Sequence, residues 1–225
     1  MTELVHLVDD DAAVRDALGV MFRSRGFRVR AYPSATDCLD GLGRRPSGCV
    51  VADMRLPDVS GLALLSRLRA RGVALPAVII TASAGAPLAV EAMEAGASDL
   101  LEKPFEDEAL IASVRRAIAT GRGEEGRDAE TRAILARFAA LGEEERDVLA
   151  GIARGRASPE IAAALGLDLR AVELHRANIM AKANVGTLVD LVRMSVIAAR
   201  SGEAGRPAPN PSRRRRSNLR GAAAA

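Results

Sequence analysis

The apolar run at residues 49–52 (CVVA) ends abruptly in the carboxylate of Asp53. An uninterrupted apolar run bounded by Gly48 and Pro57 is typical of a strand buried on both faces of a parallel sheet. Such a strand delivers its last residue to the carboxyl edge of the sheet, where open α/β folds place their chemistry. Asp is also common where a chain leaves a strand for a turn, so Asp53 alone does not establish a site.

Four other short apolar runs accompany this one, at residues 4–8, 27–32, 78–81 and 98–101. Amphipathic stretches with helical periodicity alternate with them. Five strand–helix units within residues 1–120 predict an α/β domain with a doubly wound, five-stranded parallel sheet and right-handed crossovers. The composition agrees, because 225 residues with 48% hydrophobic side chains can form one large core or two small ones.

The rest of the chain carries no strand pattern. Residues 121–127 are rich in glycine and charge and are predicted to be a linker, within a connector that becomes helical and reaches residue 140. An all-α domain of four helices is predicted at residues 141–200, with two helices joined by a short glycine-containing turn as a helix-turn-helix. The expected N-caps of its later helices are Ser158, Asp168 and Thr187.

Charge is unevenly distributed along the chain. Residues 1–120 contain 14 basic and 16 acidic side chains, whereas residues 201–225 contain six Arg and one Glu. This last segment is also rich in Pro, Gly and Ala, so it is predicted to be a disordered basic tail. Only two of the 32 basic residues are lysines, Lys103 and Lys182, which suggests that a compact ammonium is required at those positions.

The chain shows no pattern for export or membrane insertion. No apolar run reaches the length of a membrane span, and the first residues lack the order of a signal peptide. A cytoplasmic protein with no membrane partner is therefore expected. Cys38 and Cys49 show no metal-type clustering and are expected to be reduced and structural.

Reactive side chains end several of the predicted strands. The strand order of such a fold would bring these side chains to one edge of the sheet. They belong to Asp9, Asp10, Asp53, Thr81 and Lys103. Three neighbouring carboxylates repel one another, and a hard divalent cation with water ligands, Mg²⁺, is the natural occupant. A carboxylate beside such a cation can attack a phosphoryl group, with Lys103 and Thr81 contacting the phosphoryl oxygens.

These residues resemble the receiver domain of two-component response regulators, a CheY-like, flavodoxin-like fold. The resemblance covers residues 1–120 and rests on the acidic pair, on Asp53 followed by MRLP, on Thr81 and on Lys103-Pro104. It implies that Asp53 accepts phosphate from a sensor histidine kinase, with no cofactor besides Mg²⁺. It further implies a cis peptide before Pro104 and a helix N-cap at Asp11.

The resemblance also implies the cation's ligands. They are the side chains of Asp10 and Asp53, with Asp9 and the backbone carbonyl of Arg55. One departure from the family lies at Leu100, where receivers usually have an aromatic residue that rotates inward on activation. Leu100 cannot rotate in the same way. This difference affects how the effect of phosphorylation is transmitted through the domain, and not whether Asp53 is phosphorylated.

The helix predicted at residues 169–183 has two different faces. Projected at 100° per residue, one face carries the expected core residues Leu169, Val172, Ile179 and Ala183. The opposite face carries Arg170, Leu174, Ala177 and Ala181, flanked by Glu173 and Asn178. Most such faces are simply solvated, but a face of small side chains beside an arginine would fit a DNA major groove.

The sequence of this helix resembles the recognition helix of the FixJ/NarL branch of LuxR-type regulators. Receiver, linker and LuxR-type domain follow in FixJ-like order, so the chain is identified as a FixJ-like transcriptional regulator. The resemblance implies base contacts by Arg170, Glu173, Leu174 and Ala177, with Asn178 beside them. It places Arg176 and Lys182 near the DNA backbone or as braces of the domain, and His175 as a packed structural residue.

The resemblance further implies partners. Phosphorylation is expected to produce a homodimer through residues 87–95 and 98–101, which binds palindromic double-stranded DNA. RNA polymerase is a further candidate partner. Ala171, Pro159 and Glu144 each replace a residue that favours DNA in the family, and the arginines of residues 206–220 are expected to restore phosphate contacts.

Two other function classes share part of this pattern. An aspartyl phosphotransferase or phosphatase would require a second acid two residues after Asp53, where the chain has Arg55, so the chain is not predicted to be an enzyme. A DNA-binding protein that uses its receiver only for dimerisation is disfavoured by the complete carboxylate set, although Leu100 is compatible with it.

Overall fold

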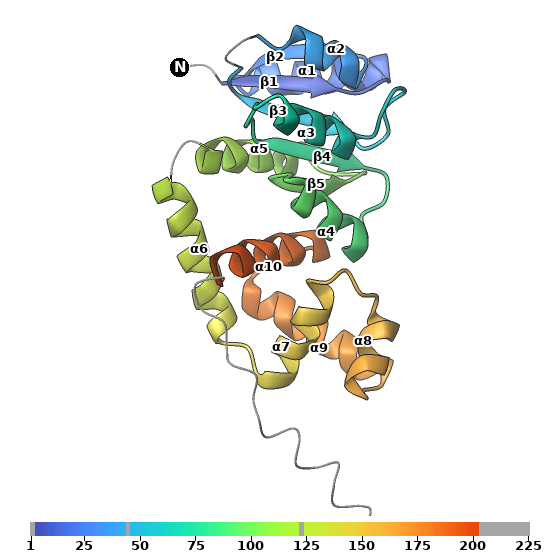
Figure 1. Ribbon diagram of the computed structural model, residues 1–225, viewed down its shortest axis with the longest axis vertical. Helices are drawn as coiled ribbons and strands as arrows, with labels where there is room; N and C mark the ends of the chain where they lie inside the picture. Colours follow the sequence, from blue (N-terminus) through green and yellow to red (C-terminus); the bar gives the residue numbers. More distant parts are fainter. Residues whose placement is uncertain (1–2, 44–45, 122–123, 203–225) are drawn as a thin grey trace, which may run out of the picture.

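A computed structural model of the protein describes residues 3–43, 46–121 and 124–202 (Figure 1). Its N-terminal part is a five-stranded parallel sheet of order β2-β1-β3-β4-β5. The strands are β1 (Leu4–Val8), β2 (Arg28–Tyr32), β3 (Cys49–Asp53), β4 (Ala77–Thr81) and β5 (Asp99–Glu102). The helices between and after them are α1 (Ala12–Ser24), α2 (Ala35–Gly41), α3 (Gly61–Ala70), α4 (Ala86–Ala95) and α5 (Asp107–Gly121). The predicted doubly wound α/β fold is confirmed.

Alternation along β3 divides the core into two layers. Cys49 and Val51 belong to one apolar cluster, together with side chains of α1 and α5. Val50 and Ala52 belong to the other, together with side chains of α2, α3 and α4. All four residues are fully buried, as expected for a central strand of a parallel sheet covered on both faces. The central strand therefore fixes Asp53 at the carboxyl edge of the sheet.

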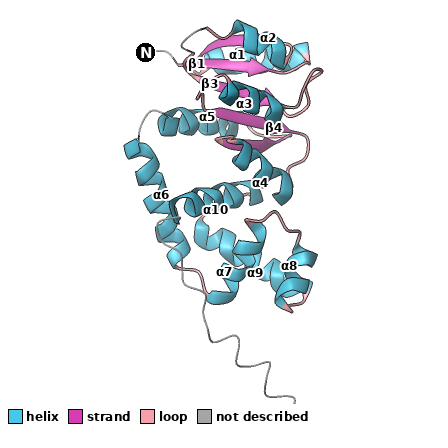
Figure 2. Cartoon of the chain, viewed as in Figure 1, coloured by secondary structure: helices cyan, strands magenta, loops and turns pink. Residues whose placement is uncertain are grey.

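The C-terminal part is entirely helical in the described residues (Figure 2). Its helices are α6 (Glu124–Ala139), α7 (Glu143–Ile152), α8 (Ser158–Leu165), α9 (Leu169–Ala183) and α10 (Leu188–Gly202). The Asp168 carboxylate accepts a 2.7 Å hydrogen bond from the Ala171 N–H, and the Thr187 hydroxyl accepts one of 3.1 Å from the Asp190 N–H. Both predicted N-caps are confirmed, and α8 and α9 form the predicted helix-turn-helix around Gly166, whose φ is 69°.

Three local predictions were wrong. Ser158 is the first residue of α8 rather than its N-cap; Ala157 takes that place, with its N–H donating to the Glu160 carboxylate. Residues 124–127, predicted as linker, begin α6, because one glycine in a helix costs only about 1 kcal/mol. Leu169, predicted in the core, is 49% exposed, since it lies in the first turn of α9 beyond the packed part of the helix.

The two parts of the chain are in contact through α10. This helix packs along α4 and reaches β5, so it covers the face on which dimerisation was predicted (Figure 1). The α6 helix leads from α5 to the second part and also packs against α10. The predicted basic tail from residue 203 onward lies outside the described residues. Within the described ranges, no helix is long and apolar enough to cross a membrane.

Candidate functional site

Asp53, Lys103 and Asp9 meet at the carboxyl edge of the sheet, as predicted. The Lys103 Nζ lies 2.6 Å from Oδ1 of Asp53 and 3.5 Å from Oδ2 of Asp9. The other carboxylate oxygen of Asp53 accepts a 2.6 Å hydrogen bond from the backbone N–H of Arg55. The β3 and β5 strands thus deliver the carboxylate and the ammonium to one point. The Lys103–Pro104 peptide is cis, as the receiver resemblance implied.

The environment of Asp9 favours a nearby cation. Its side chain is buried, and burial raises its pKa; the N–H of Asp11 and the charge of Lys103 oppose this only in part. Burial alone would lower the pKa of Lys103, but its hydrogen bond to Asp53 and the charges of the two carboxylates outweigh burial and raise it. The two carboxylates therefore stabilise the ammonium of Lys103, whereas burial still dominates the raised pKa of Asp9.

The other predicted site residues surround this contact without joining it. Asp10 is exposed, and its backbone carbonyl accepts a hydrogen bond from Arg15. The Thr81 hydroxyl, at the end of β4, is buried and exchanges hydrogen bonds with the backbone of Ser83. Asp11 caps α1 by accepting from the N–H groups of Ala13 and Val14, as predicted.

The donor chemistry of this edge fits a hard cation. Asp9 and Asp53 converge on a single positive group, the ammonium of Lys103, with oxygen atoms of the kind that Mg²⁺ prefers. In the described residues no three His, Cys, Asp or Glu side chains are gathered as a metal cluster. Of the predicted ligands, Asp9 and Asp53 are brought together here. With Asp10, the backbone carbonyl of Arg55 and water, they would hold Mg²⁺.

The loop between β3 and α3 is anchored by a residue that sequence reasoning missed. The Asp58 carboxylate accepts hydrogen bonds from the N–H groups of Ala35 and Thr36, at 3.2 and 2.8 Å, and from the Thr36 hydroxyl at 2.6 Å. The bond from the Thr36 hydroxyl is the largest cause that lowers the pKa of Asp58, to about 2. The sequence offered one signal, an Asp directly after Pro57, but nothing to show that its partners belong to α2.

The same loop needs a glycine where it enters α3. The Gly61 N–H donates to the carbonyl of Met54, and a Cβ at this position would lie 2.5 Å from the backbone oxygen of Asp53. Only glycine allows this close approach. The loop that carries Arg55 is therefore held at Gly61 and at Asp58.

Leu100 is buried at 2% exposure in β5, inside the apolar cluster shared with α3 and α4. It pairs with Ile79 in the sheet. The side chain that replaces the usual aromatic residue thus lies in the core.

The candidate DNA-binding face lies on α9. Arg170, Glu173, Ala177 and Asn178 are exposed, and Leu174 is 61% exposed, whereas Val172, Ile179 and Ala183 are buried as predicted. Glu173 is paired with Arg176, which also donates to the Ser158 hydroxyl at 2.9 Å. The apolar side chain of Leu174 is therefore the most prominent apolar group of this face.

Lys182 and Arg176, two of the predicted contact residues, are engaged within the helical domain, and His175 is packed there as predicted. The Lys182 ammonium lies 2.7 and 2.9 Å from the two carboxylate oxygens of Glu145 in α7. His175 is half-buried, with Nε2 3.3 Å from the Glu144 carboxylate. In this structure Lys182 and Arg176 brace α9 against α7 and α8.

The comparisons with known proteins agree with both halves of the structure. The family described as "Response regulator receiver domain" matches residues 5–115, and "Bacterial regulatory proteins, luxR family" matches residues 139–195. The transcriptional regulatory protein FixJ of Azorhizobium caulinodans is 43% identical over 195 residues, which cover 86% of this chain and 92% of that protein. The chain belongs to the FixJ-like response regulators.

Further relatives support this membership. FixJ of Bradyrhizobium diazoefficiens is 40% identical over 86% of this chain and 95% of its own length. The crystal structure of full-length FixJ from B. japonicum superimposes with a TM-score of 0.53 at 39% identity, covering 89% of this chain and 99% of that one. This FixJ-like chain is accordingly a two-component response regulator with a LuxR-type DNA-binding domain, a regulator of transcription and not an enzyme.

Proposed function

We propose that a sensor histidine kinase phosphorylates Asp53, and that the phosphorylated chain dimerises and binds a palindromic DNA site. The observation that carries this proposal is the 2.6 Å contact between the Lys103 ammonium and the Asp53 carboxylate. It presents a carboxyl nucleophile next to a cation that can contact the charged oxygens of a phosphoryl group.

In the proposed transfer, a carboxylate oxygen of Asp53 forms a bond to phosphorus while the bond from phosphorus to the kinase histidine nitrogen breaks. Lys103 exchanges its contact with the carboxylate for a contact with a phosphoryl oxygen. The Thr81 hydroxyl would leave the backbone of Ser83 to bind a second oxygen. Mg²⁺, held by Asp53 and the acidic pair, would supply charge neutralisation.

Dimerisation through α4 and β5 requires that α10 move. The contact of α10 with α4 and β5 occupies the surface that two receivers would share. A shift of Thr81 towards a phosphoryl group would alter the loop that leads into α4, and so weaken the α10 contact. Leu100, packed in the core behind α4, would transmit this movement by repacking instead of by rotating an aromatic ring.

DNA binding is proposed to use the exposed face of α9. An apolar side chain in a major groove reads the thymine methyl group, and Leu174 with Ala177 supplies such a surface. Arg170 would contact a phosphate or a guanine at the N-terminal end of the helix.

The test combines phosphorylation with site selection. The chain would be phosphorylated with acetyl phosphate and Mg²⁺, and duplexes would be selected from a random pool by the phosphorylated form. The proposal predicts recovery of palindromic sites and an affinity about tenfold lower for Leu174→Ala, because the truncation removes apolar surface worth about 0.8 kcal/mol for each buried methylene. Leu135→Ala, at an exposed position of α6, is the matched control and should bind normally. Equal selection by the unphosphorylated chain would instead indicate a constitutive DNA-binding protein.

A further inference from the structure

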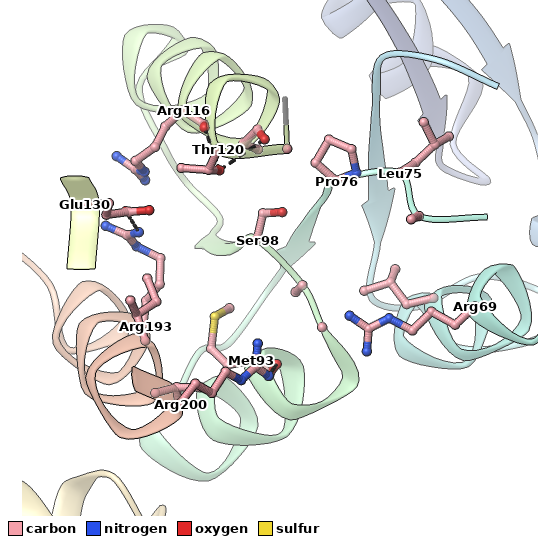
Figure 3. A pocket seen from close by; sticks show the side chains of 18 of the residues that line it. Arg69, Leu75, Pro76, Met93, Ser98, Arg116, Thr120, Glu130, Arg193 and Arg200 are labelled. Atoms are coloured by element: carbon pink, nitrogen blue, oxygen red, sulfur yellow. Dashed lines mark hydrogen bonds and ion pairs between the residues drawn. The ribbon is translucent and has the colours of Figure 1, made fainter. Parts of the chain in front are cut away.

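A cavity of about 710 Å³ lies between the receiver and the helical domain (Figure 3). Its walls come from α3, α4 and α5 on the receiver side and from α6 and α10 on the other. The volume is that of a metabolite site, and such sites are common where two domains meet. The cavity is distinct from the Asp53 edge, and neither phosphorylation nor DNA binding, as proposed above, uses it.

Four arginines line this cavity, and two of them have carboxylate partners. Arg116 is paired with Asp99, and the Arg193 guanidinium lies 2.5 Å from the Glu130 carboxylate. The other two are Arg69 of α3 and Arg200 of α10, and neither has an ion pair among the residues that the structure describes. One comes from each side of the cavity.

Both unpaired guanidinium groups approach the C-terminal end of α4 (Figure 3). Arg200 donates a 2.7 Å hydrogen bond to the carbonyl of Met93. Arg69 lies across Gly96, so closely that a Cβ there would be 1.3 Å from its Nη2. Gly96 has a φ of 89° and ends the helix.

The end of α4 does not balance this charge. A helix C-terminus carries roughly half of one negative charge, whereas the two guanidinium groups carry two positive charges. Two like charges gathered at one helix end repel each other, and an oxyanion between them would relieve the repulsion with charge-assisted hydrogen bonds. Four arginines line the cavity against two carboxylates, Asp128 and Glu130. The geometry therefore favours an anionic ligand over a neutral or cationic one.

We propose that this cavity binds a small organic anion whose carboxylate or phosphate group bridges Arg69 and Arg200. Apolar side chains such as Pro76, Val196 and Ile197 line the rest of the cavity and would contact the body of the ligand. The hydroxyls of Ser98 and Thr131 offer neutral hydrogen bonds.

A bridging anion would also regulate the switch, and this part rests on the proposed function. Because the anion touches both the receiver and α10, it binds only the docked arrangement. It would therefore hold α10 on α4 and oppose the dimerisation that phosphorylation promotes. The FixJ-like chain would then respond to a metabolite as well as to its kinase.

The test measures anion binding to the full, unphosphorylated chain by isothermal titration calorimetry without Mg²⁺ at constant ionic strength. Citrate and inorganic phosphate are the probes, which separates carboxylate from phosphate chemistry. At least one should bind saturably at one site per chain. Arg69→Gln and Arg200→Gln should each weaken binding about tenfold or more, since each removes a charge-assisted contact. Arg67→Gln, on the same helix α3 but outside the cavity, should leave the affinity unchanged.

Two results would overturn the proposal. One is that neither probe binds saturably. The other is an equal loss of affinity in Arg67→Gln and Arg69→Gln. Arg200→Gln also removes the hydrogen bond to Met93, so Arg69→Gln is the decisive variant because it leaves that bond in place. Binding is measured without phosphorylation, so a negative result here leaves the phosphoacceptor role of Asp53 untouched.

Discussion

The ammonium of Lys103 lies 2.6 Å from the Asp53 carboxylate. Asp53 ends β3 and Lys103 directly follows β5, and these two strands are not adjacent in the sheet. The long lysine side chain spans the end of β4 to reach the carboxylate. The contact holds the Asp53 carboxylate in one orientation. It also explains why a lysine persists in a chain whose basic residues are otherwise almost all arginine.

Replacing Lys103 with arginine should therefore disable the switch while keeping the charge. A planar guanidinium cannot take the place of a compact ammonium against both Asp53 and a phosphoryl oxygen. We expect phosphorylation-induced dimerisation, measured by sedimentation, to be lost or greatly reduced. Arg67→Lys, the reverse exchange at an exposed position, serves as control. Full dimerisation of Lys103→Arg would show that any cation suffices.

Asp58 is expected to support the cation site by holding the loop that contains Arg55. In Asp58→Asn the charge-assisted bonds to Ala35, Thr36 and the Thr36 hydroxyl are weakened. Mg²⁺ should then bind several-fold more weakly in calorimetry, with phosphorylation recovering at higher Mg²⁺ concentration. Asp16→Asn, at an exposed position of α1, should bind Mg²⁺ normally. An unchanged Mg²⁺ affinity in Asp58→Asn would show that Asp58 only caps α2 and does not support the cation site.

The Lys182–Glu145 pair predicts an acid-sensitive helical domain. The hydrogen bond from Lys182 is the first cause that lowers the pKa of Glu145, helped by the N–H of Gly142. A lowered folded-state pKa means that the stabilisation is complete above the unfolded value, about 4.3, and is lost as pH falls through the folded value. Urea midpoints of the helical domain should drop on acidification below about pH 5. The drop should be smaller in Glu145→Gln, and an identical drop would exclude this pair as its origin.

The docking of α10 on α4 can be tested without phosphorylation. Ile197 of α10 is partly buried against the core cluster that includes α4, and a charge there should weaken the contact. In Ile197→Asp, we expect amide hydrogen exchange in α4 (Ala86–Ala95) to accelerate about tenfold, because the change removes apolar burial worth about 0.8 kcal/mol for each methylene and places a charge in the contact. Leu135→Asp, on the exposed side of α6, should not affect α4. Unchanged exchange in Ile197→Asp would mean that α10 does not protect this face.

The sequence predicted the receiver closely because its information is local. The apolar runs and the cap at Asp11 each determine structure within a few residues. Even the convergence of Asp53 and Lys103 followed from the rule that parallel strands end at one edge.

The features that were missed depend on contacts between distant segments. Nothing near Asp58 indicates that it binds α2, and nothing in α10 indicates that its apolar face packs on α4. The exposure of Leu169 was missed because helical periodicity identifies a face but not how far the packing extends along it. The arginines of the interdomain cavity come from separate helices, so no motif in the sequence could have grouped them.

The most direct test of the account is phosphorylation of Asp53→Asn. The wild-type chain, incubated with a radiolabelled phosphohistidine donor and Mg²⁺, should acquire one hydroxylamine-sensitive acyl phosphate per chain. The amide introduced by Asp53→Asn lacks the nucleophilic carboxylate oxygen, so this variant should acquire none while remaining folded by circular dichroism. Full labelling of Asp53→Asn at the wild-type rate would contradict the central claim that Asp53 is the phosphoacceptor.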